Sequence, residues 1–301
     1  MFRLSRYIAV ILISSFFAIS CQGIEEMGVE EEKDASYLER EDNPYTTLMS
    51  LGGNLPPQPQ GGDCWGDFFF QFSTNNSTVR VYNLLTRKLV YTIKVPLEQI
   101  GFVPTCHCNT VCFGSEYYDD KDEFPLIYVS TGNASNGYTG ALVYRITRKQ
   151  YQFDLALVQT LRFPVDKSSW TEFVPAGEYA YLCYTSERII YKYRMPKLSE
   201  GDIILTRELA EDSFQFAPQP EWMLTSRNQD RLFYNGKIIY ITGVPEAGEA
   251  SAFVILNMET LERETIIDFL SIGLNREPES VFKWRDKICV AFLDQIVILK
   301  I

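Results

Sequence analysis

Nine side chains in this sequence have the types expected of a binding site for a hydroxylated ligand. Their short segments each bring a polar or acidic group close to an aromatic ring, an imidazole or a proline. The nine residues are Asp63, Trp65, His107, Asn109, Trp170, Glu172, Glu221, Trp222 and Glu279. Indole rings suit the apolar faces of sugars, and polar side chains suit their hydroxyl edges. If the fold gathers these segments at one rim, we expect a site for a glycan or a partner protein.

Some of the same side chains support a second hypothesis, a glycan hydrolase or lyase. His107 is the one histidine of the chain, and an imidazole can act as a general base near neutral pH. Glu172 and Glu279 could act as an acid–base pair on a glycosidic bond, for which their separation is decisive. No serine stands in a GxSxG nucleophile elbow. We therefore expect a binding module without catalytic residues, with the glycan-active enzyme as the alternative.

Cysteines are crowded around the histidine. Cys106, Cys108 and Cys112 would share one face of a strand, and His107 would point to the other face. A tetrahedral metal site needs converging ligands, and the paired CxxC spacing is absent. We therefore expect no metal and no other cofactor. A disulfide within the group formed by Cys64 and these three cysteines is compatible with a location outside the cytoplasm, and its pairing stays open.

Short apolar strands separated by turn residues repeat five times along the body of the chain. The first strand of each unit, with the turn before it, spans residues 66–72, 124–130, 178–184, 236–242 and 286–292. A second strand follows at residues 79–84, 141–146, 188–193, 252–257 and 295–300. A third follows in four units, at residues 89–95, 155–163, 203–209 and 264–269. Five units of roughly 50 residues predict an all-β fold, a β-propeller of five blades.

The fifth unit ends at Ile301 without a third strand. We expect residues 45–51 to supply it and to close the ring, because a propeller leaves only short, protected strand edges. A hidden divergent repeat would give six or seven blades, and a β-sandwich is the alternative architecture. In a propeller the nine candidate side chains would surround one channel mouth. In a purely structural role they would instead cap strands, solvate the channel and pack between blades.

The composition limits the class of protein. Of 301 residues, 46% are hydrophobic and 22% are charged, which is the balance of a globular protein. Aromatic residues make up 14% and favour strands. The formal net charge is −11, whereas a nucleic-acid-binding protein needs a basic surface. We therefore expect no nucleic-acid partner.

The beginning of the chain predicts a bacterial lipoprotein signal. Arg3 and Arg6 precede an apolar run at residues 7–20 that ends before Cys21 and is shorter than the ~20 residues of a membrane span. We expect cleavage after residue 20 and lipidation of Cys21, which would anchor the protein to a membrane. Residues 21–62 are acidic and then rich in proline and glycine, which predicts a tether. Residues 63–301 remain for the propeller domain.

Five segments of the body carry a likeness to a known family. They are residues 60–67 (QGGDCWGD), 107–114 (HCNTVCFG), 122–130 (DEFPLIYVS), 158–164 (VQTLRFP) and 277–282 (EPESVF). They resemble a group of extracytoplasmic β-propeller lipoproteins of Gram-negative bacteria, over most of residues 60–301. The resemblance implies fold and location, not an activity. Among lipoprotein signals, Gln22 after the cysteine implies the outer membrane, with the periplasmic and surface faces both open.

Overall fold

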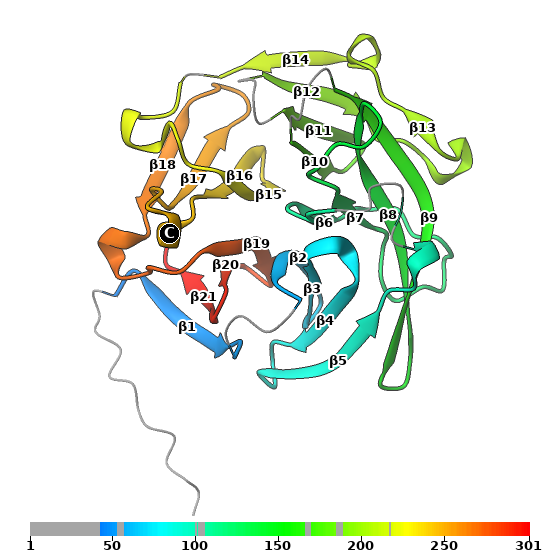
Figure 1. Ribbon diagram of the computed structural model, residues 1–301, viewed down its shortest axis with the longest axis horizontal. Helices are drawn as coiled ribbons and strands as arrows, with labels where there is room; N and C mark the ends of the chain where they lie inside the picture. The colour runs from blue at the N-terminus through cyan, green and yellow to red at the C-terminus, as the bar shows by residue number, and fades with distance from the viewer. Residues whose placement is uncertain are drawn as a thin grey trace, which may run out of the picture. The chain divides into compact units, whose positions relative to one another are not determined.

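Five small β-sheets surround one axis in the body of the protein (Figure 1). The computed structural model describes residues 43–52, 57–99, 101, 106–165, 170–184, 189–216 and 218–301. The prediction of an all-β, five-bladed β-propeller is confirmed. The predicted signal peptide and Cys21 lie outside the described residues. Within these ranges no helix has the length and apolar character needed to cross a bilayer.

Each sheet is one blade, numbered in chain order and built from the axis outwards. The innermost strands are β2 Pro59–Trp65, β6 Val111–Phe113, β10 Thr171–Ala176, β15 Asn228–Tyr234 and β19 Pro278–Trp284. The second strands are β3 Phe68–Ser73, β7 Ile127–Ser130, β11 Tyr179–Tyr184, β16 Lys237–Thr242 and β20 Lys287–Phe292. The third strands are β4 Thr78–Asn83, β8 Tyr138–Lys149, β12 Ile189–Arg194, β17 Ala252–Asn257 and β21 Gln295–Leu299. The fourth strands are β5 Lys88–Lys94, β9 Gln152–Pro164, β14 Asp212–Gln215, β18 Arg263–Asp268 and β1 Tyr45–Ser50.

Strand β1 closes the ring, as expected for residues 45–51. It pairs antiparallel with β21, with Tyr45 opposite Leu299 and Ser50 opposite Gln295. The described propeller therefore begins at Tyr45, ahead of the boundary at residue 63 that the proline- and glycine-rich segment predicts. The last residues of that segment, from Pro59 onwards, form β2 itself.

Residues 203–209 differ from the prediction of an outer strand for blade three. β13 (Ile203–Ile204) pairs in parallel with β9 of blade two, and residues 207–209 form a 3₁₀ turn. The outer strand of blade three is β14, which pairs antiparallel with β12. The physical reason is packing, because the side chains of Ile203 and Leu205 join the apolar cluster between blades two and three.

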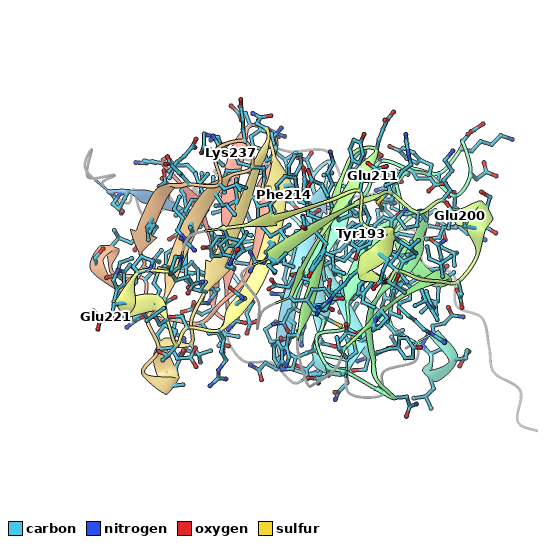
Figure 2. All side chains as sticks on the ribbon, turned by 90° about the horizontal axis from the view of Figure 1, so that it is seen from above. Tyr193, Glu200, Glu211, Phe214, Glu221 and Lys237 are labelled. Carbon is cyan, nitrogen blue, oxygen red and sulfur yellow. The ribbon has the colours of Figure 1, made fainter. Side chains whose placement is uncertain are left out.

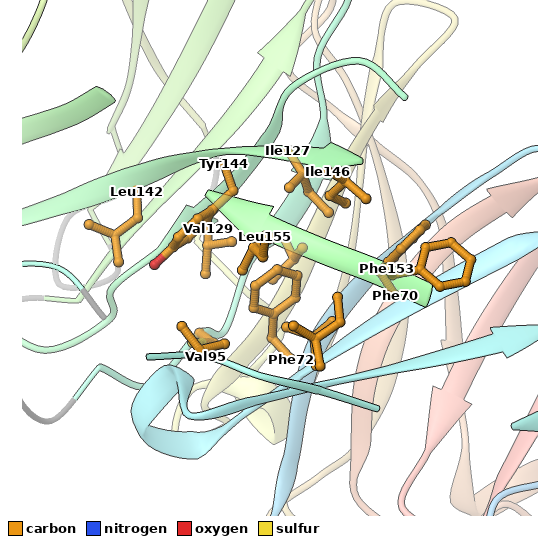
Figure 3. Packing of buried hydrophobic residues seen from close by; sticks show 14 of the residues in the cluster. Phe70, Phe72, Val95, Ile127, Val129, Leu142, Tyr144, Ile146, Phe153 and Leu155 are labelled. Atoms are coloured by element: carbon orange, nitrogen blue, oxygen red, sulfur yellow. The ribbon is translucent and has the colours of Figure 1, made fainter. Parts of the chain in front are cut away.

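The apolar core lies between neighbouring blades. Figure 3 shows Phe70 of blade one beside Phe153 of blade two, and Phe72 of blade one contacts Tyr144 of blade two. Full burial of such a side chain contributes roughly 1.5–3 kcal/mol. One blade alone would leave its apolar faces in water, so the blades are stable only as a ring.

Candidate functional site

The N-terminal ends of the innermost strands gather at one end of the ring, because these strands all run in the same direction in a propeller. We call this end the strand-start rim. It is defined by His107, Asn109, Trp170, Asn228, Gln229, Glu277 and Glu279. Four of the predicted site residues belong to it, namely His107, Asn109, Trp170 and Glu279.

His107 and Trp170 meet across the seam between blades two and three. Their ring centroids lie 4.8 Å apart with the planes at 43°, and both side chains are half-buried. The Nδ1 atom of His107 lies 2.7 Å from Oδ1 of Asn109. The Nδ2 group of Asn109 donates to the carbonyl oxygen of Asn228. Asn109 thus links the imidazole of blade two to the backbone of blade four.

This hydrogen-bond network assigns the tautomer of His107. Because Nδ2 of Asn109 is the donor to Asn228, its Oδ1 is the acceptor for His107, which must carry its proton on Nδ1. Burial lowers the pKa of His107, and the nearby Arg227 lowers it further against the opposing effect of the Asn109 hydrogen bond. The imidazole is therefore neutral at pH 7. Its Nε2 atom is a bare acceptor that meets no hydrogen-bond donor among the described residues.

The backbone of blade one holds the His107 segment from the other side. The Gly61 N–H donates to the carbonyl oxygen of Cys108 at 3.0 Å. A Cβ atom on Gly61 would lie 2.1 Å from the carbonyl oxygen of Asn109. No side chain fits at this approach, so a glycine is required there. The position of the imidazole therefore depends on contacts with three blades.

Glu279 lies at the same rim with an incomplete set of hydrogen bonds. Its side chain is 1% exposed, and Oε1 has no partner among the described residues. Burial raises the pKa of Glu279 well above its usual range, and the neighbouring Glu277 adds to this effect. Glu277 itself accepts a hydrogen bond at 2.8 Å from Nε2 of Gln229. A neutral Glu279 carboxyl is a hydrogen-bond donor as well as an acceptor.

Asp63 and Glu172, also predicted for the site, serve contacts between blades. The Asp63 carboxylate accepts the backbone N–H groups of Cys64 and Phe113, both at 2.7 Å. Burial raises the pKa of Asp63 to about 7, and these two donors limit the rise. Glu172 forms an ion pair with Arg231 in which both side chains are buried. Neither carboxylate is presented to a ligand at the surface.

Side-chain hydrogen bonds of this kind cross all five seams of the ring. The contacts, in blade order, are Asp63–Phe113, Ser130–Phe173, Glu172–Arg231, Asp230–Val281 and Ser280–Gln60. Four of them satisfy a backbone N–H or carbonyl group of an innermost strand, and the Glu172–Arg231 contact joins two side chains. Polar residues at the axis therefore hold the ring together.

Trp65 lies at the end of the ring opposite the strand-start rim, whereas Glu221 and Trp222 lie on the strand-start side but at its outer edge. Trp65 ends β2 at the opposite end of the ring, where its indole contacts Phe113 at 5.8 Å between centroids. Glu221 and Trp222 lie in an exposed 3₁₀ turn before blade four. Figure 2 places Glu221 at the outer edge of the molecule, at the end opposite Lys237.

The sequence reasoning missed Asn228 and Gln229. The innermost strand of blade four begins only at Asn228, because residues 221–223 form the 3₁₀ turn. The turn Asn235-Gly236 could have indicated the position of this innermost strand from the sequence. The seven residues before that turn correspond to the seven of β2 before its own Gly66-Asp67 turn.

A separate cavity of about 350 Å³ lies at the opposite, strand-end rim, on the seam between blades five and one. Its lining residues are Cys64, Gly66, Asp67, Lys283 and Arg285. Asp67 accepts hydrogen bonds from the Trp284 indole at 3.0 Å and from Arg285 at 3.1 Å. Within the described ranges no three His, Cys, Asp or Glu side chains are grouped so that they could hold a metal ion.

Neither a protein-family model nor a curated protein matches the sequence. The fold is similar to that of glutaminyl cyclase from Myxococcus xanthus, at 10% identity and a TM-score of 0.52, over 85% of this chain and 94% of that one. A tail fiber of Staphylococcus aureus phage P68 gives 8% identity and a TM-score of 0.48, over 85% and 53% of the two chains. The WD40 β-propeller domain of Doa1 gives 12% and 0.42, over 85% and 97%. At 10% identity, the likeness to the glutaminyl cyclase establishes the propeller fold alone.

Proposed function

We propose that this protein is a lipid-anchored binding protein of the bacterial cell envelope that holds a glycan at the strand-start rim. The observation that carries the proposal is the His107–Trp170 pair, which joins an indole to a neutral imidazole at 4.8 Å. A sugar ring stacks its apolar face on an indole and donates a hydroxyl hydrogen to a nearby acceptor. Nε2 of His107 is such an acceptor, and Asn109 keeps it in that form.

The binding role is favoured over a glycan hydrolase or lyase by the state of the carboxylates. Acid–base cleavage of a glycosidic bond needs two carboxyl groups that face the bond. Glu172 forms a buried ion pair with Arg231. It therefore does not serve as the second carboxyl group that Glu279 would need for acid–base cleavage. At 10% identity, the fold shared with a glutaminyl cyclase supports no particular reaction for this chain.

The experiment is a binding screen of the mature chain, residues 21–301, produced with Cys21 replaced by Ser to keep it in solution. Peptidoglycan fragments and soluble hexose oligosaccharides serve as probes, with calorimetry as the readout and reducing-end release as the test for turnover. Trp170→Ala should weaken binding at least tenfold, and His107→Gln should weaken it as well. The matched control Trp222→Ala, in the exposed turn, should bind as the parent does.

Three outcomes would contradict the glycan-binding proposal. They are absence of binding to every saccharide, equal binding by Trp170→Ala and the parent, and turnover of a saccharide. Turnover would favour the enzyme. A protein captured through this rim in the absence of saccharide binding would favour the partner-protein reading.

The membrane anchor is tested separately in the full-length chain. Lipidation requires the thiol of Cys21, so Cys21→Ser should abolish incorporation of a labelled fatty acid. The variant should also move from the detergent phase to the aqueous phase after phase separation. Retention of the label by the variant would rule out this anchor.

A further inference from the structure

Two thiol groups touch in the core between blades one and two. The sulfur atoms of Cys106 and Cys108 lie 3.3 Å apart, and neither residue is exposed to solvent. The sequence left the pairing open within a group that also contained Cys64 and Cys112. Their thiols instead contact the carbonyl oxygens of Gly66 and Arg231.

No other pair of sulfur atoms makes such a contact among the described residues. Cys289 shares an apolar cluster with Cys64, and Cys183 shares one with Cys112, but no sulfur–sulfur contact joins either pair. The structure therefore reduces the alternatives for a disulfide to one pair. That pair encloses the single histidine of the chain.

The backbone of this segment is held by three hydrogen bonds. Asn75 donates to the Cys106 carbonyl at 2.7 Å, His107 donates to the Thr131 carbonyl at 2.8 Å, and Gly61 donates to the Cys108 carbonyl at 3.0 Å. In an extended segment, Cα atoms two residues apart fall near the upper end of the range of about 4.4–6.8 Å that a disulfide accepts. Bond formation therefore needs side-chain rotation and little movement of the backbone.

Cys108 adopts a backbone conformation that residues with side chains rarely use. Its φ angle is +43°, in the left-handed region. Such a residue persists where surrounding contacts or a covalent bond hold it. Both cysteines belong to the apolar core between blades one and two, while the imidazole between them contacts Trp170.

We propose that Cys106 and Cys108 form an intramolecular disulfide as the domain folds in an oxidising compartment. A Cys106 thiolate attacks the disulfide of a thiol–disulfide exchange catalyst and forms a mixed disulfide, and a Cys108 thiolate then displaces the catalyst. The substrate loses two protons and two electrons, and the catalyst is left as a dithiol. The proposal rests on the proposed location outside the cytoplasm only for the supply of this oxidant.

The timing of this reaction follows from burial. The attacking species in thiol–disulfide exchange is the thiolate, and burial raises the pKa of Cys108 well above its usual range, with Cys106 adding to the effect. Phe72 and Tyr144 belong to the same buried apolar cluster as the pair in the folded domain. The bond therefore forms before the two blades close over it, and the closed domain then protects it from reductants. Once formed, it fixes the segment that presents His107 to Trp170.

Thiol counting in the full-length chain, expressed with its own N-terminus, tests this directly. The protein is unfolded with and without prior reduction, labelled with a maleimide, and weighed intact. We expect two fewer additions without reduction, and peptide mapping should link Cys106 to Cys108. An equal number of additions in both samples, or a bridge to any other cysteine, would overturn the proposal.

Refolding in a glutathione redox buffer separates this proposal from the proposed export. If the chain is not exported but the pair closes in this buffer, the location is wrong and the pairing stands. If the chain is exported and the pair stays reduced in both experiments, the pairing is wrong. The control is Cys289→Ala, which removes another buried thiol. This variant should still take up two fewer maleimide groups without prior reduction than after it. Cys106→Ala and Cys108→Ala should each take up the same number of maleimide groups with and without prior reduction.

A nuclear magnetic resonance measurement reads the effect on the site. The single imidazole gives one resolvable set of histidine signals in the parent protein. Reduction during unfolding, followed by refolding without an oxidant, should shift these signals in the parent and in Cys289→Ala. Unchanged histidine signals would overturn the claim that the bond positions His107, even where thiol counting finds the bond.

Discussion

Asp63 and Asp230 make the same double contact at two different seams of the propeller. In each, one carboxylate oxygen accepts the backbone N–H of the following residue at 2.7 Å. The other oxygen accepts a backbone N–H from the innermost strand of the next blade, from Phe113 at 2.7 Å and from Val281 at 2.9 Å. Each carboxylate thus completes the hydrogen bonding of a neighbouring strand and fixes its distance from the axis.

Replacing Asp63 with Asn should weaken the seam between blades one and two. The carboxyl group offers an oxygen atom to each of the two backbone donors whether or not it is protonated. The amide replaces one of these oxygens with an NH₂ group, which leaves a buried N–H without a partner. Such a loss costs about 1–3 kcal/mol. Urea denaturation of the parent and Asp63→Asn at pH 5 measures the difference, and equal stability would contradict the role assigned to Asp63.

The stability difference between these two proteins should depend on pH. Burial raises the pKa of Asp63 from 3.8 to about 7, so the folded state favours the protonated carboxyl relative to the unfolded state. This contribution is fully present below pH 3.8 and is lost as pH rises through 7. Denaturation at pH 5 and pH 8 should therefore give a smaller difference at pH 8. A difference that grows with pH would show that the carboxylate form is the stabilising one.

Removal of one partner of the Glu172–Arg231 ion pair should lower the stability of the protein strongly, whereas replacement of both partners should lower it only slightly. Both side chains are buried, so Glu172→Met leaves a buried guanidinium without its partner and should cost about 3–5 kcal/mol. The double variant Glu172→Met with Arg231→Met removes both charges and should recover most of that loss. A double-mutant cycle by urea denaturation measures the coupling, and additive losses would contradict it.

Closure of the ring by β1 should make its buried side chains essential. Leu48 is 5% exposed, and Leu48→Asp would bury an unpaired carboxylate, which should cost about 3 kcal/mol or more. Ser50→Asp in the same strand is the control, because Ser50 is exposed. Thermal unfolding and limited proteolysis compare the two. Equal unfolding midpoints would show that β1 is dispensable for the ring.

Much of the propeller was predictable because its strands obey local rules. Alternation of apolar residues and turn signals revealed the second and third strands of the blades and the outer strands of blades one, two and four, but not the innermost strands. The missing strand at Ile301 predicted the closure by residues 45–51. The outer strand of blade three was not predictable from such a pattern. Ile203 and Leu205 are apolar because they fill the space between two blades, whereas the strand β14 has an exposed and polar sequence.

The candidate site was predictable only in part, for a different reason. His107, Asn109 and Trp170 were expected together at one rim, and each stands just before an innermost strand, β6 or β10, that the sequence pattern did not predict. Arg231 was not singled out, because its partnership with Glu172 joins residues 59 positions apart. Contacts of this kind depend on the register of two neighbouring blades, which a single strand pattern does not encode.

The histidine titration of the saccharide complex tests the central claim most directly. A hydroxyl that donates to Nε2 stabilises the neutral imidazole, so the pKa of His107, already lowered by burial, should fall further when a saccharide from the screen is bound. Nuclear magnetic resonance of the single histidine, recorded from pH 4 to pH 8 with and without saturating saccharide, measures both values. A pKa that is unchanged or raised by the saccharide would contradict binding at the His107–Trp170 pair.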